Sequence, residues 1–348
     1  MKMKTTSNSP AMIQIDGSHG EGGGQILRTA LSLSAITGIP FSLDSIRAGR
    51  KSPGLMRQHL ACVRAVSQVC SAHVKGAILR STCLDFYPGP IGHSHGVFEI
   101  GSAGSTGLLL QTLLPVLLHG DAESEITLRG GTHAIQAPCF DYLDEIYAPR
   151  LRAMGAQFTL ELNRIGFFPA GGGEVEARIT PSTLKPEVFD SESKPKLESV
   201  EILTTPSISD RVPEKEIDAL ARKLTFSAHQ TRVRVVTDSQ CPGNAILLRA
   251  TGGTLIASHG QRGKTSERVA KAAAGAMNRY LQAGAPIDPF LADQLLVPMA
   301  LAGGGEFVTA GLSSHFHTNV ETIQQFLPIE VETLTNPNGG QRVLLTHH

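Results

Sequence analysis

The chain has 348 residues, 41% of them hydrophobic, and its 31 basic side chains balance 31 acidic ones. A chain of this length buries a substantial core and has room for two domains. The net charge of zero excludes broad, non-specific attraction to nucleic acid, although a local basic patch is compatible with it.

The five cysteines and the apolar stretches indicate the compartment. The number of cysteines is odd and no C-x-x-C pair occurs, which favours a reduced, cytoplasmic environment. Residues 1–11 lack an apolar core, so we expect a disordered tail rather than a signal peptide. The longest apolar stretch, residues 108–118, is interrupted by Gln111 and Pro115 and is too short to span a bilayer. We expect it to be a buried helix.

Residues 15–58 contain features that favour a phosphate site. A glycine run at 22–24 follows the acidic Glu21 and precedes a helix expected at 25–37, which ends at Gly38. Glycine lets the backbone approach a ligand closely, and the free N–H groups at a helix start favour an anion. The run lacks both the Gly-Lys-Ser/Thr of a Walker loop and the spacing of a dinucleotide fingerprint.

A basic cluster supports the same interpretation. Arg47, Arg50 and Lys51 precede a second expected helix, for which Ser52 is the N-cap and Pro53 the first helical residue. The competing interpretation is a tight turn with solvated arginines, which is the commoner meaning of a glycine run. The combination of acid, glycines and basic cluster favours the phosphate site.

Three further motifs have both a functional and a structural interpretation. His93 and His95 lie two apart in a Gly/Pro loop, but no third metal ligand is near in sequence, so the loop interpretation is favoured. Gln111 is a polar amide on an apolar helix, and it is either a satisfied core amide or a contact to a base. Pro138 is either a turn former or a rigid wall for a flat ligand.

The order strand, glycine loop, apolar helix recurs along the chain, which predicts an α/β protein of repeated units with helices packed on small sheets. A linker rich in Pro and Ser at 180–196 leads into a compact α/β module, and 290–327 returns to the earlier order. The module therefore interrupts a domain that closes afterwards. The other expected elements are a hairpin around 77–87, strands at 97–100, 126–128, 158–162, 166–169, 174–179, 200–204, 232–237, 245–250, 254–260 and 306–310, and helices at 140–154, 215–224, 266–283, 291–301 and from Val320.

Five long motifs carry a specific resemblance. They are DGxxGEGGGQILR at 16–28, IRAGRxxPGLxxQH at 46–59, GSAGS at 101–105, FFPAGGG at 167–173 and LADQLxxPMALAGxGEF at 291–307. On these motifs the chain resembles the RNA 3′-terminal phosphate cyclases over nearly its whole length. The resemblance implies a large domain of three repeated βα units, at 12–183 and 288–348, with a smaller α/β domain at 184–287 inserted between the second and third units.

The resemblance also implies a reaction. In this family a histidine attacks the α-phosphorus of ATP, holds AMP on a ring nitrogen and passes it to an RNA 3′-phosphate, which gives RNA-(3′)pp(5′)A. The neighbouring 2′-hydroxyl then displaces AMP and closes a 2′,3′-cyclic phosphate. The implied partners are ATP, Mg²⁺ or Mn²⁺ and RNA 3′-phosphate ends; no membrane is implied, and the sequence predicts no particular oligomeric state.

By motif, the resemblance assigns roles to individual residues. Glu21 is implied as the metal ligand. The implied phosphate contacts are Arg28, Arg47, Arg50 and Gln58. The implied nucleoside pocket consists of Gln111, Pro138, Phe290, Leu291, Ala292, Asp293 and Gln294. A tyrosine is associated with the position of Phe290 in relatives, so stacking is retained here without a hydroxyl contact.

His315 is the predicted nucleophile, and His317 is its rival. On an extended segment the two would point the same way and would resemble a metal pair. His315 is favoured because it follows Ser313-Ser314 at the end of a strand, which is the family's place for the adenylated histidine, and because no third ligand is close. A neutral imidazole is also a competent nucleophile near neutral pH.

Two other functions compete with the active cyclase. One is a non-catalytic relative that acts as a ribosome-assembly binding factor, but such proteins lack the histidine that this chain has. The other is a transferase of the enolpyruvyl type, which shares the repeat architecture. The histidine and the RNA-type motifs count against it.

Overall fold

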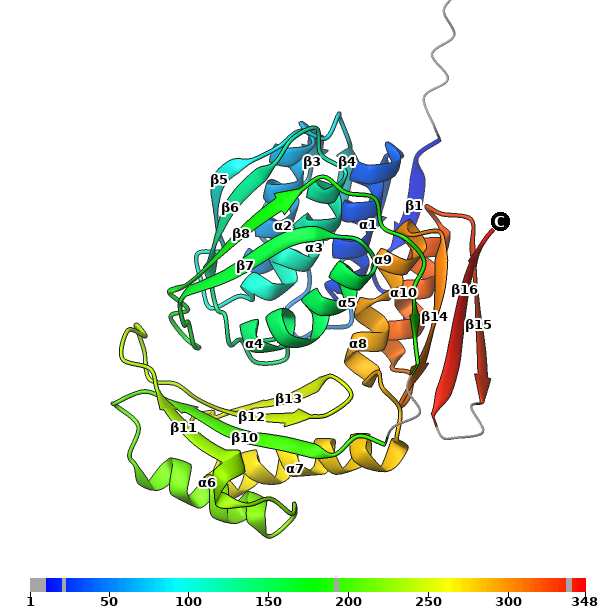
Figure 1. The fold of residues 1–348 in the computed structure, drawn as a ribbon. Coiled ribbons are helices and arrows are strands. Elements are labelled where there is room, and N and C mark those ends of the chain that lie inside the picture. The colour runs from blue at the N-terminus through cyan, green and yellow to red at the C-terminus, as the bar shows by residue number, and fades with distance from the viewer. Residues whose placement is uncertain (1–10, 21–22, 191–193, 336–339) are drawn as a thin grey trace, which may run out of the picture.

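The computed structural model describes residues 11–20, 23–190, 194–335 and 340–348. Within these ranges the chain forms four four-stranded sheets with helices between and beside them, so the predicted α/β class is confirmed. Figure 1 shows three sheets around a group of helices and the fourth sheet below them. In the described part of the chain, every helix is too short or too polar to cross a membrane.

Three of the sheets share one topology. In each, the first two strands are parallel, the other contacts are antiparallel, and the fourth strand lies between the second and third, as in the order β1-β2-β4-β3. The strands are β1 (Ile13–Asp16), β2 (Phe41–Asp44), β3 (His73–Lys75) and β4 (Leu84–Tyr87) in the first sheet, β5 (His95–Glu99), β6 (Ser124–Gly130), β7 (Gln157–Arg164) and β8 (Gly173–Thr180) in the second, and β9 (Val188–Phe189), β14 (Gly304–Thr309), β15 (Ile329–Thr335) and β16 (Gln341–His347) in the third. Residues 188–189 thus belong to the third sheet, although they lie within the range predicted for the inserted domain. The domain boundaries themselves stay predictions.

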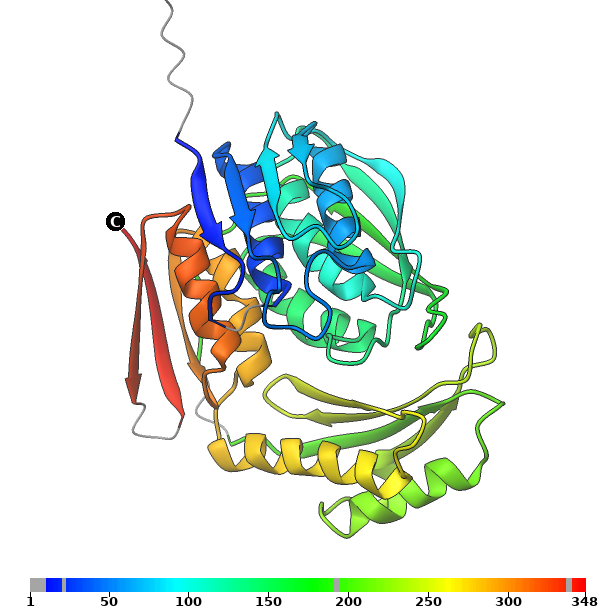
Figure 2. The same ribbon diagram turned by 180° about the vertical axis from the view of Figure 1, so that it is seen from behind.

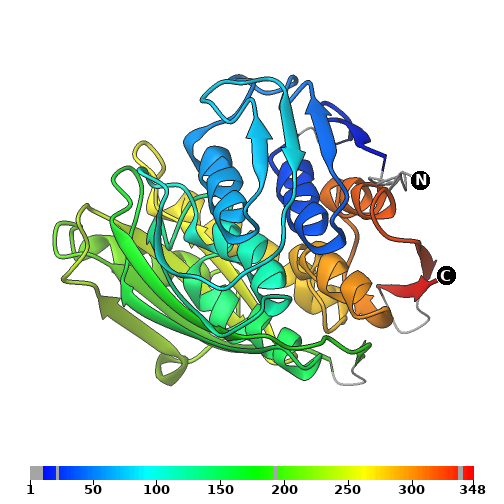
Figure 3. The same ribbon diagram turned by 90° about the horizontal axis from the view of Figure 1, so that it is seen from above.

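The helices of these three units pack against one another at the centre. Figure 3 shows them side by side with the sheets outside. They are α1 (Gln25–Thr37), α2 (Arg57–Val69), α3 (Thr106–Leu118), α4 (Phe140–Tyr142), a π-helical turn (Leu143–Tyr147), α5 (Ala148–Ala153), α8 (Pro289–Gln294), α9 (Leu296–Leu301) and α10 (Ser314–Gln324). Helix α3 is apolar on nearly all sides and contacts both α1 and α2, as expected for a helix surrounded by others.

The fourth sheet lies between two groups of helices, and its two central strands, β10 and β12, are largely buried. It has the strand order β11-β10-β12-β13, and Figure 2 shows α6 and α7 covering the face turned away from the other sheets. Its elements are β10 (Leu197–Thr204), α6 (Arg211–Ala221), a 3₁₀ turn (Ala228–Gln230), β11 (Thr231–Val235), β12 (Asn244–Ala250), β13 (Thr254–His259) and α7 (Ser266–Ala283). Along β12, Ile246 and Leu248 pack with α7, whereas Ala245 and Leu247 join the main core. This alternation places β13 directly beside the central helices.

Several predicted elements were wrong in extent. The expected strand at 166–169 is a turn with a single bridge between Phe167 and Gly171. The expected linker at 180–196 contains β9, because its two residues pair with β14. The helix expected at 291–301 is divided at Leu295 into α8 and α9, and the helix expected from Val320 begins at Ser314.

Candidate active site

A cavity of about 820 Å³ lies between the central helices and the fourth sheet. Its walls come from α1, the chain around the start of α2, α3, α8 and α10 on one side and from β13 and α7 on the other. The predicted site residues that line it are Arg28, Arg47, Arg50, Gln58, Gln111, Pro138, Phe290, Asp293, Gln294 and His315. Leu291 and Ala292 are fully buried and do not line it. The predicted metal ligand Glu21 lies outside the described residues, so the divalent metal stays a prediction.

The start of α1 forms one end of the cavity. Gly24 is the N-cap of α1 and, having no side chain, leaves the first N–H groups of the helix to a ligand. A Cβ atom at Gly24 would lie 2.3 Å from Nε2 of His59, so only glycine fits between α1 and α2. The close neighbour of this glycine is thus a side chain of α2, and the predicted approach of the backbone to a ligand stays a prediction.

The basic residues around this end differ in their surroundings. Arg28 lies one turn into α1, where burial lowers its pKa, and Arg50 is exposed at the cavity mouth. Nη1 of Arg47 donates to the carbonyl oxygens of Ser52 (2.7 Å) and Gly54 (3.0 Å). An arginine keeps its charge in proteins, so this end of the cavity is cationic.

The predicted start of α2 was wrong. The helix begins at Arg57 after the N-cap Met56, because the chain from Ser52 to Gly54 folds around the guanidinium of Arg47. The N–H of Met56 donates to Nδ1 of His59 at 3.1 Å, so the proton of that imidazole is on Nε2. Burial, with the charges of Arg28 and Arg47, lowers the pKa of His59 to about 3, and the ring is therefore neutral at neutral pH.

His315 lies in the first turn of α10. Oγ of the N-cap Ser313 accepts from the N–H of Phe316 at 3.2 Å, which starts the helix six residues earlier than the sequence predicted. Residues two apart on a helix point about 200° apart. The expectation that His315 and His317 point the same way was therefore wrong: His315 lines the cavity, whereas His317 is exposed and does not.

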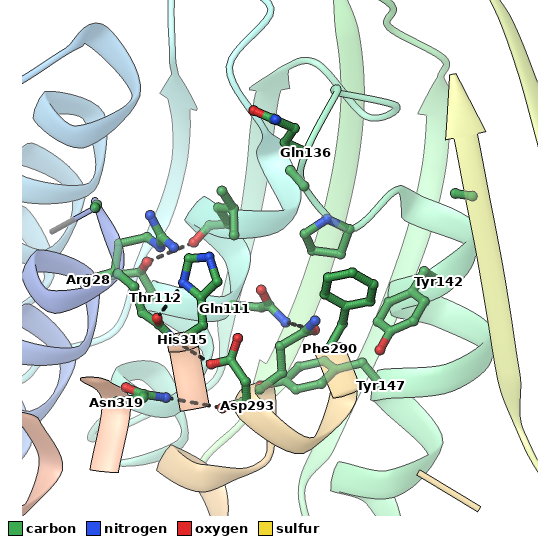
Figure 4. A pocket seen from close by; sticks show the side chains of 18 of the residues that line it. Arg28, Gln111, Thr112, Gln136, Tyr142, Tyr147, Phe290, Asp293, His315 and Asn319 are labelled. Atoms are coloured by element: carbon green, nitrogen blue, oxygen red, sulfur yellow. Dashed lines mark hydrogen bonds between the residues drawn. The ribbon is translucent and has the colours of Figure 1, made fainter. Parts of the chain in front are cut away.

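Gln25 connects His315 to Asp293. Nδ1 of His315 lies 2.9 Å from Oε1 of Gln25, and Nε2 of Gln25 donates to Oδ1 of Asp293, as the dashed lines of Figure 4 show around His315 and Asp293. The opposite amide orientation would turn its oxygen toward a carboxylate. An amide oxygen only accepts, so Nδ1 of His315 carries the proton and Nε2 keeps the lone pair.

Asp293 is held in place by both neighbouring helices. Burial raises its pKa to about 6, while the charge of His315, the bond from Gln25 and the charge of Arg28 favour the ionised form. Nδ2 of Asn319 donates to the backbone oxygen of Asp293 at 3.1 Å. Above pH 6 the carboxylate is negative, and it therefore lies where it offsets positive charge on His315.

The residues predicted for a nucleoside lie on the opposite side of His315 from the cationic end of the cavity. Nε2 of Gln111 donates to Oε1 of Gln294 at 2.5 Å, so the amide on the apolar helix α3 is both satisfied and part of the cavity wall. The ring of Phe290 is 61% exposed and lines the cavity together with Pro138. Oε1 of Gln58 accepts from the N–H of Ser105 at 2.8 Å, which fixes the start of α3.

Sequence reasoning missed Gln25 and His59 as site residues. Gln25 precedes Arg28 and Thr29 by three and four residues and thus shares their face of α1, which is the local signal that was available. His59 follows the predicted Gln58 directly, but its role depends on contacts with Gly24 and Met56 that no local pattern predicts.

Together these residues define a class of protein. A cationic pocket beside a helix start, with a histidine in its wall, is typical of enzymes that act on phosphate-bearing substrates.

Comparison with known proteins identifies the family. The family described as RNA 3′-terminal phosphate cyclase matches residues 19–333, and the chain belongs to it. Relatives named RNA 3′-terminal phosphate cyclase include one from Ectopseudomonas mendocina, 43% identical over 92% of this chain and 94% of the relative. Others come from Koribacter versatilis, 40% identical over 96% and 95%, and from Salmonella enteritidis, 41% identical over 94% and 97%. The resemblance and the enzyme class predicted from the motifs are confirmed.

Proposed function

We propose that this protein uses ATP to convert RNA 3′-phosphate ends into 2′,3′-cyclic phosphates, with His315 as the nucleophile. The observation that carries the proposal is the chain of hydrogen bonds from His315 through Gln25 to Asp293, which holds a proton on Nδ1 of His315 beside the cavity that this residue lines. The names of the relatives support the substrate class.

In the first step Nε2 of His315 attacks the α-phosphorus of ATP. A P–N bond forms, the bond to the bridging oxygen breaks and pyrophosphate leaves. The proton on Nδ1 stays in its bond to Oε1 of Gln25, so the adenylated ring is a cation. The carboxylate of Asp293, reached through Gln25, stabilises this positive charge. Arg28, Arg47 and Arg50 bind the phosphate oxygens.

In the next two steps the AMP group moves to the RNA and leaves. An oxygen of the RNA 3′-phosphate attacks the phosphorus of the adenylate, the P–N bond breaks and His315 recovers its lone pair. The 2′-hydroxyl then attacks the 3′-phosphorus, loses its proton and displaces AMP as the ring closes. Adenylation thus converts a poor leaving group into a good one and divides one difficult step into easier ones.

The nucleoside of ATP is placed between Phe290 and Pro138 in this proposal. Both line the cavity, and the exposed ring of Phe290 is available for stacking on a purine. Gln111 and Gln294, which are hydrogen-bonded to each other, provide amides in the wall of the same cavity. Phe290 lacks a hydroxyl, so the base is held here by stacking and by amide contacts rather than by a phenol.

The test compares two histidines on the same helix. With α-labelled ATP and no RNA, His315→Ala should give no labelled protein and His317→Ala should give as much as wild type, because only His315 lines the cavity. With an RNA 3′-phosphate, His315→Ala should also give no cyclic product. A labelled adduct in His315→Ala that is missing in His317→Ala would reverse the assignment. No adduct in wild type would favour the non-catalytic binding factor.

A further inference from the structure

A second cavity of about 290 Å³ adjoins the first. It lies between the loop that precedes α4 and the elements β13 and α7 of the fourth sheet. Gln136, Ser258 and His259 line both cavities, so the two spaces share part of their walls. None of the residues assigned above to ATP lines the second cavity, which therefore has room for a different ligand group.

The rim of the second cavity is cationic. Lys264 and Arg268 line it with exposed side chains, and neither forms an ion pair with the part of the chain that the structure describes. The 18-residue helix α7 begins between them, after the N-cap Thr265. The positive end of a helix dipole adds to the two charges, so the cavity suits an anion.

A buried polar atom in the wall points to a ligand independently of these charges. Nε2 of His259 is inaccessible to solvent and has no hydrogen-bond partner among the described residues. Burial and the neighbouring His133 lower the pKa of His259 to about 4, so the ring is neutral and carries a single N–H. A buried polar group without a partner is rare, and this one belongs to a residue that lines both cavities.

We propose that the second cavity binds the RNA phosphodiester immediately 5′ of the terminal 3′-phosphate, with Lys264 and Arg268 on the phosphate. The inference rests on the proposed function, since it places the RNA whose end reaches His315. A single RNA strand that passes along the shared wall would place a phosphate, one nucleotide behind the reacting one, in the second cavity. The apolar stretch of the shared wall, including Ala257 and Ala272, takes the adjoining nucleoside.

The test separates the step that needs RNA from the step that does not. The double variant Lys264→Ala/Arg268→Ala should show wild-type self-adenylation with labelled ATP, whereas KM for an oligoribonucleotide 3′-phosphate should rise at least roughly tenfold and depend less on salt. KM for a nucleoside 3′-phosphate, which has no internucleotide phosphate, should stay within twofold. The matched control Lys271→Ala/Arg279→Ala removes the same charges from exposed positions of α7 outside the cavity and should leave both KM values unchanged.

Three results would overturn the inference. An unchanged oligonucleotide KM would show that the cavity does not contact RNA, reduced self-adenylation would assign it to ATP, and an equal rise for the nucleoside 3′-phosphate would assign it to the terminal phosphate. If wild type itself formed no adenylate, the proposed function would fail. Fluorescence anisotropy with a labelled oligonucleotide 3′-phosphate would still test the cavity, because the double variant should bind roughly tenfold more weakly than wild type.

Discussion

In the proposed function the buried carboxylate of Asp293 lowers the stability of the protein but stabilises positive charge on His315. Replacing Asp293 should therefore change both the unfolding free energy and the rate of self-adenylation. Its carboxyl group lies in a buried position beside Gln25 and His315, and burial raises its pKa from 3.8 to about 6. Asp293→Asn keeps the shape and an oxygen that accepts from Gln25, but it removes the negative charge. We therefore expect the variant to be more stable than wild type at neutral pH and slower in self-adenylation.

The size of the effect follows from the two pKa values. A difference of about 2 between the folded and unfolded pKa corresponds to about 3 kcal/mol of unfolding free energy. Because the folded pKa is the higher one, the folded state binds more protons between pH 4 and pH 6, and the contribution of Asp293 to stability falls as pH rises through that window. The asparagine does not titrate, so its advantage should grow from pH 4 to pH 7 by up to about 3 kcal/mol.

Urea denaturation of both proteins at pH 4.0 and pH 7.5 measures this change, and ~3 kcal/mol is the largest difference expected. The matched control Asp218→Asn neutralises an exposed carboxyl on α6 and should change stability by less than about 0.5 kcal/mol at either pH. If Asp293→Asn gained nothing between the two pH values, the carboxyl would not be ionised at a cost, and its proposed role as the counter-charge of His315 would lose its basis.

Two other substitutions test the cationic end of the cavity. Gly24→Ala places a Cβ 2.3 Å from Nε2 of His59 and should lower the unfolding free energy by about 1–3 kcal/mol in the same urea assay. The control Gly275→Ala lies inside α7, where the nearest atom is 3.6 Å away, and should raise the unfolding free energy by about 0.5–1 kcal/mol. Arg50→Ala should slow self-adenylation at least roughly tenfold, because it removes a charge-assisted bond to phosphate. The control Lys51→Ala changes a residue outside the cavity and should leave the rate unchanged. Equal rates in both variants would show that Arg50 is a solvated surface residue rather than a phosphate contact.

The elements predicted best are those whose ends are determined locally. Helix α1 runs between two glycines, Gly24 and Gly38, and Gly38 has the left-handed φ of 73° that ends a helix. Helix α7 is likewise bounded by Thr265, whose side chain accepts from the N–H of Arg268, and by Gly284. Each of these signals lies within one turn of the boundary that it sets, so a single sequence is enough to read it.

The elements predicted poorly depend on partners elsewhere in the chain. Ser52-Pro53 is a good local helix start, but the carbonyl of Ser52 is used by Arg47 and the helix begins later. The strand β9 has only two residues and exists because β14 lies beside it. Strands β15 and β16 were not predicted at all. The edge strand β15 is largely exposed, and β16 buries only Val343 and Leu345, so the alternation of burial along both strands is short.

The residues of the site show the same difference between local signals and contacts with distant parts of the chain. Motifs gave the residue types that line the cavity, but Gln25 and His315 are 290 residues apart, and no local spacing predicts their hydrogen bond. Motif position favoured His315 over His317, and His315 is the one of the two that lines the cavity. The expectation of an extended segment was wrong, because Ser313 caps a helix there. The tautomer of His315, on which the proposed chemistry depends, became accessible only from the side chains around it.

The position of His315 depends on a buried hydrogen bond between α1 and α10. Oγ1 of Thr29 donates to Oδ1 of Asn319 at 2.7 Å, and Nδ2 of the same asparagine donates to the backbone of Asp293. Thr29 is one turn after Gln25 on α1, and Asn319 is one turn after His315 on α10, so this bond fixes the register of the two helices that carry the donor and the acceptor. Because both side chains are buried, breaking the bond would leave two unsatisfied polar groups. The hydrogen bond between Gln25 and His315, and with it the proposed tautomer of His315, therefore depends on the register of α1 and α10.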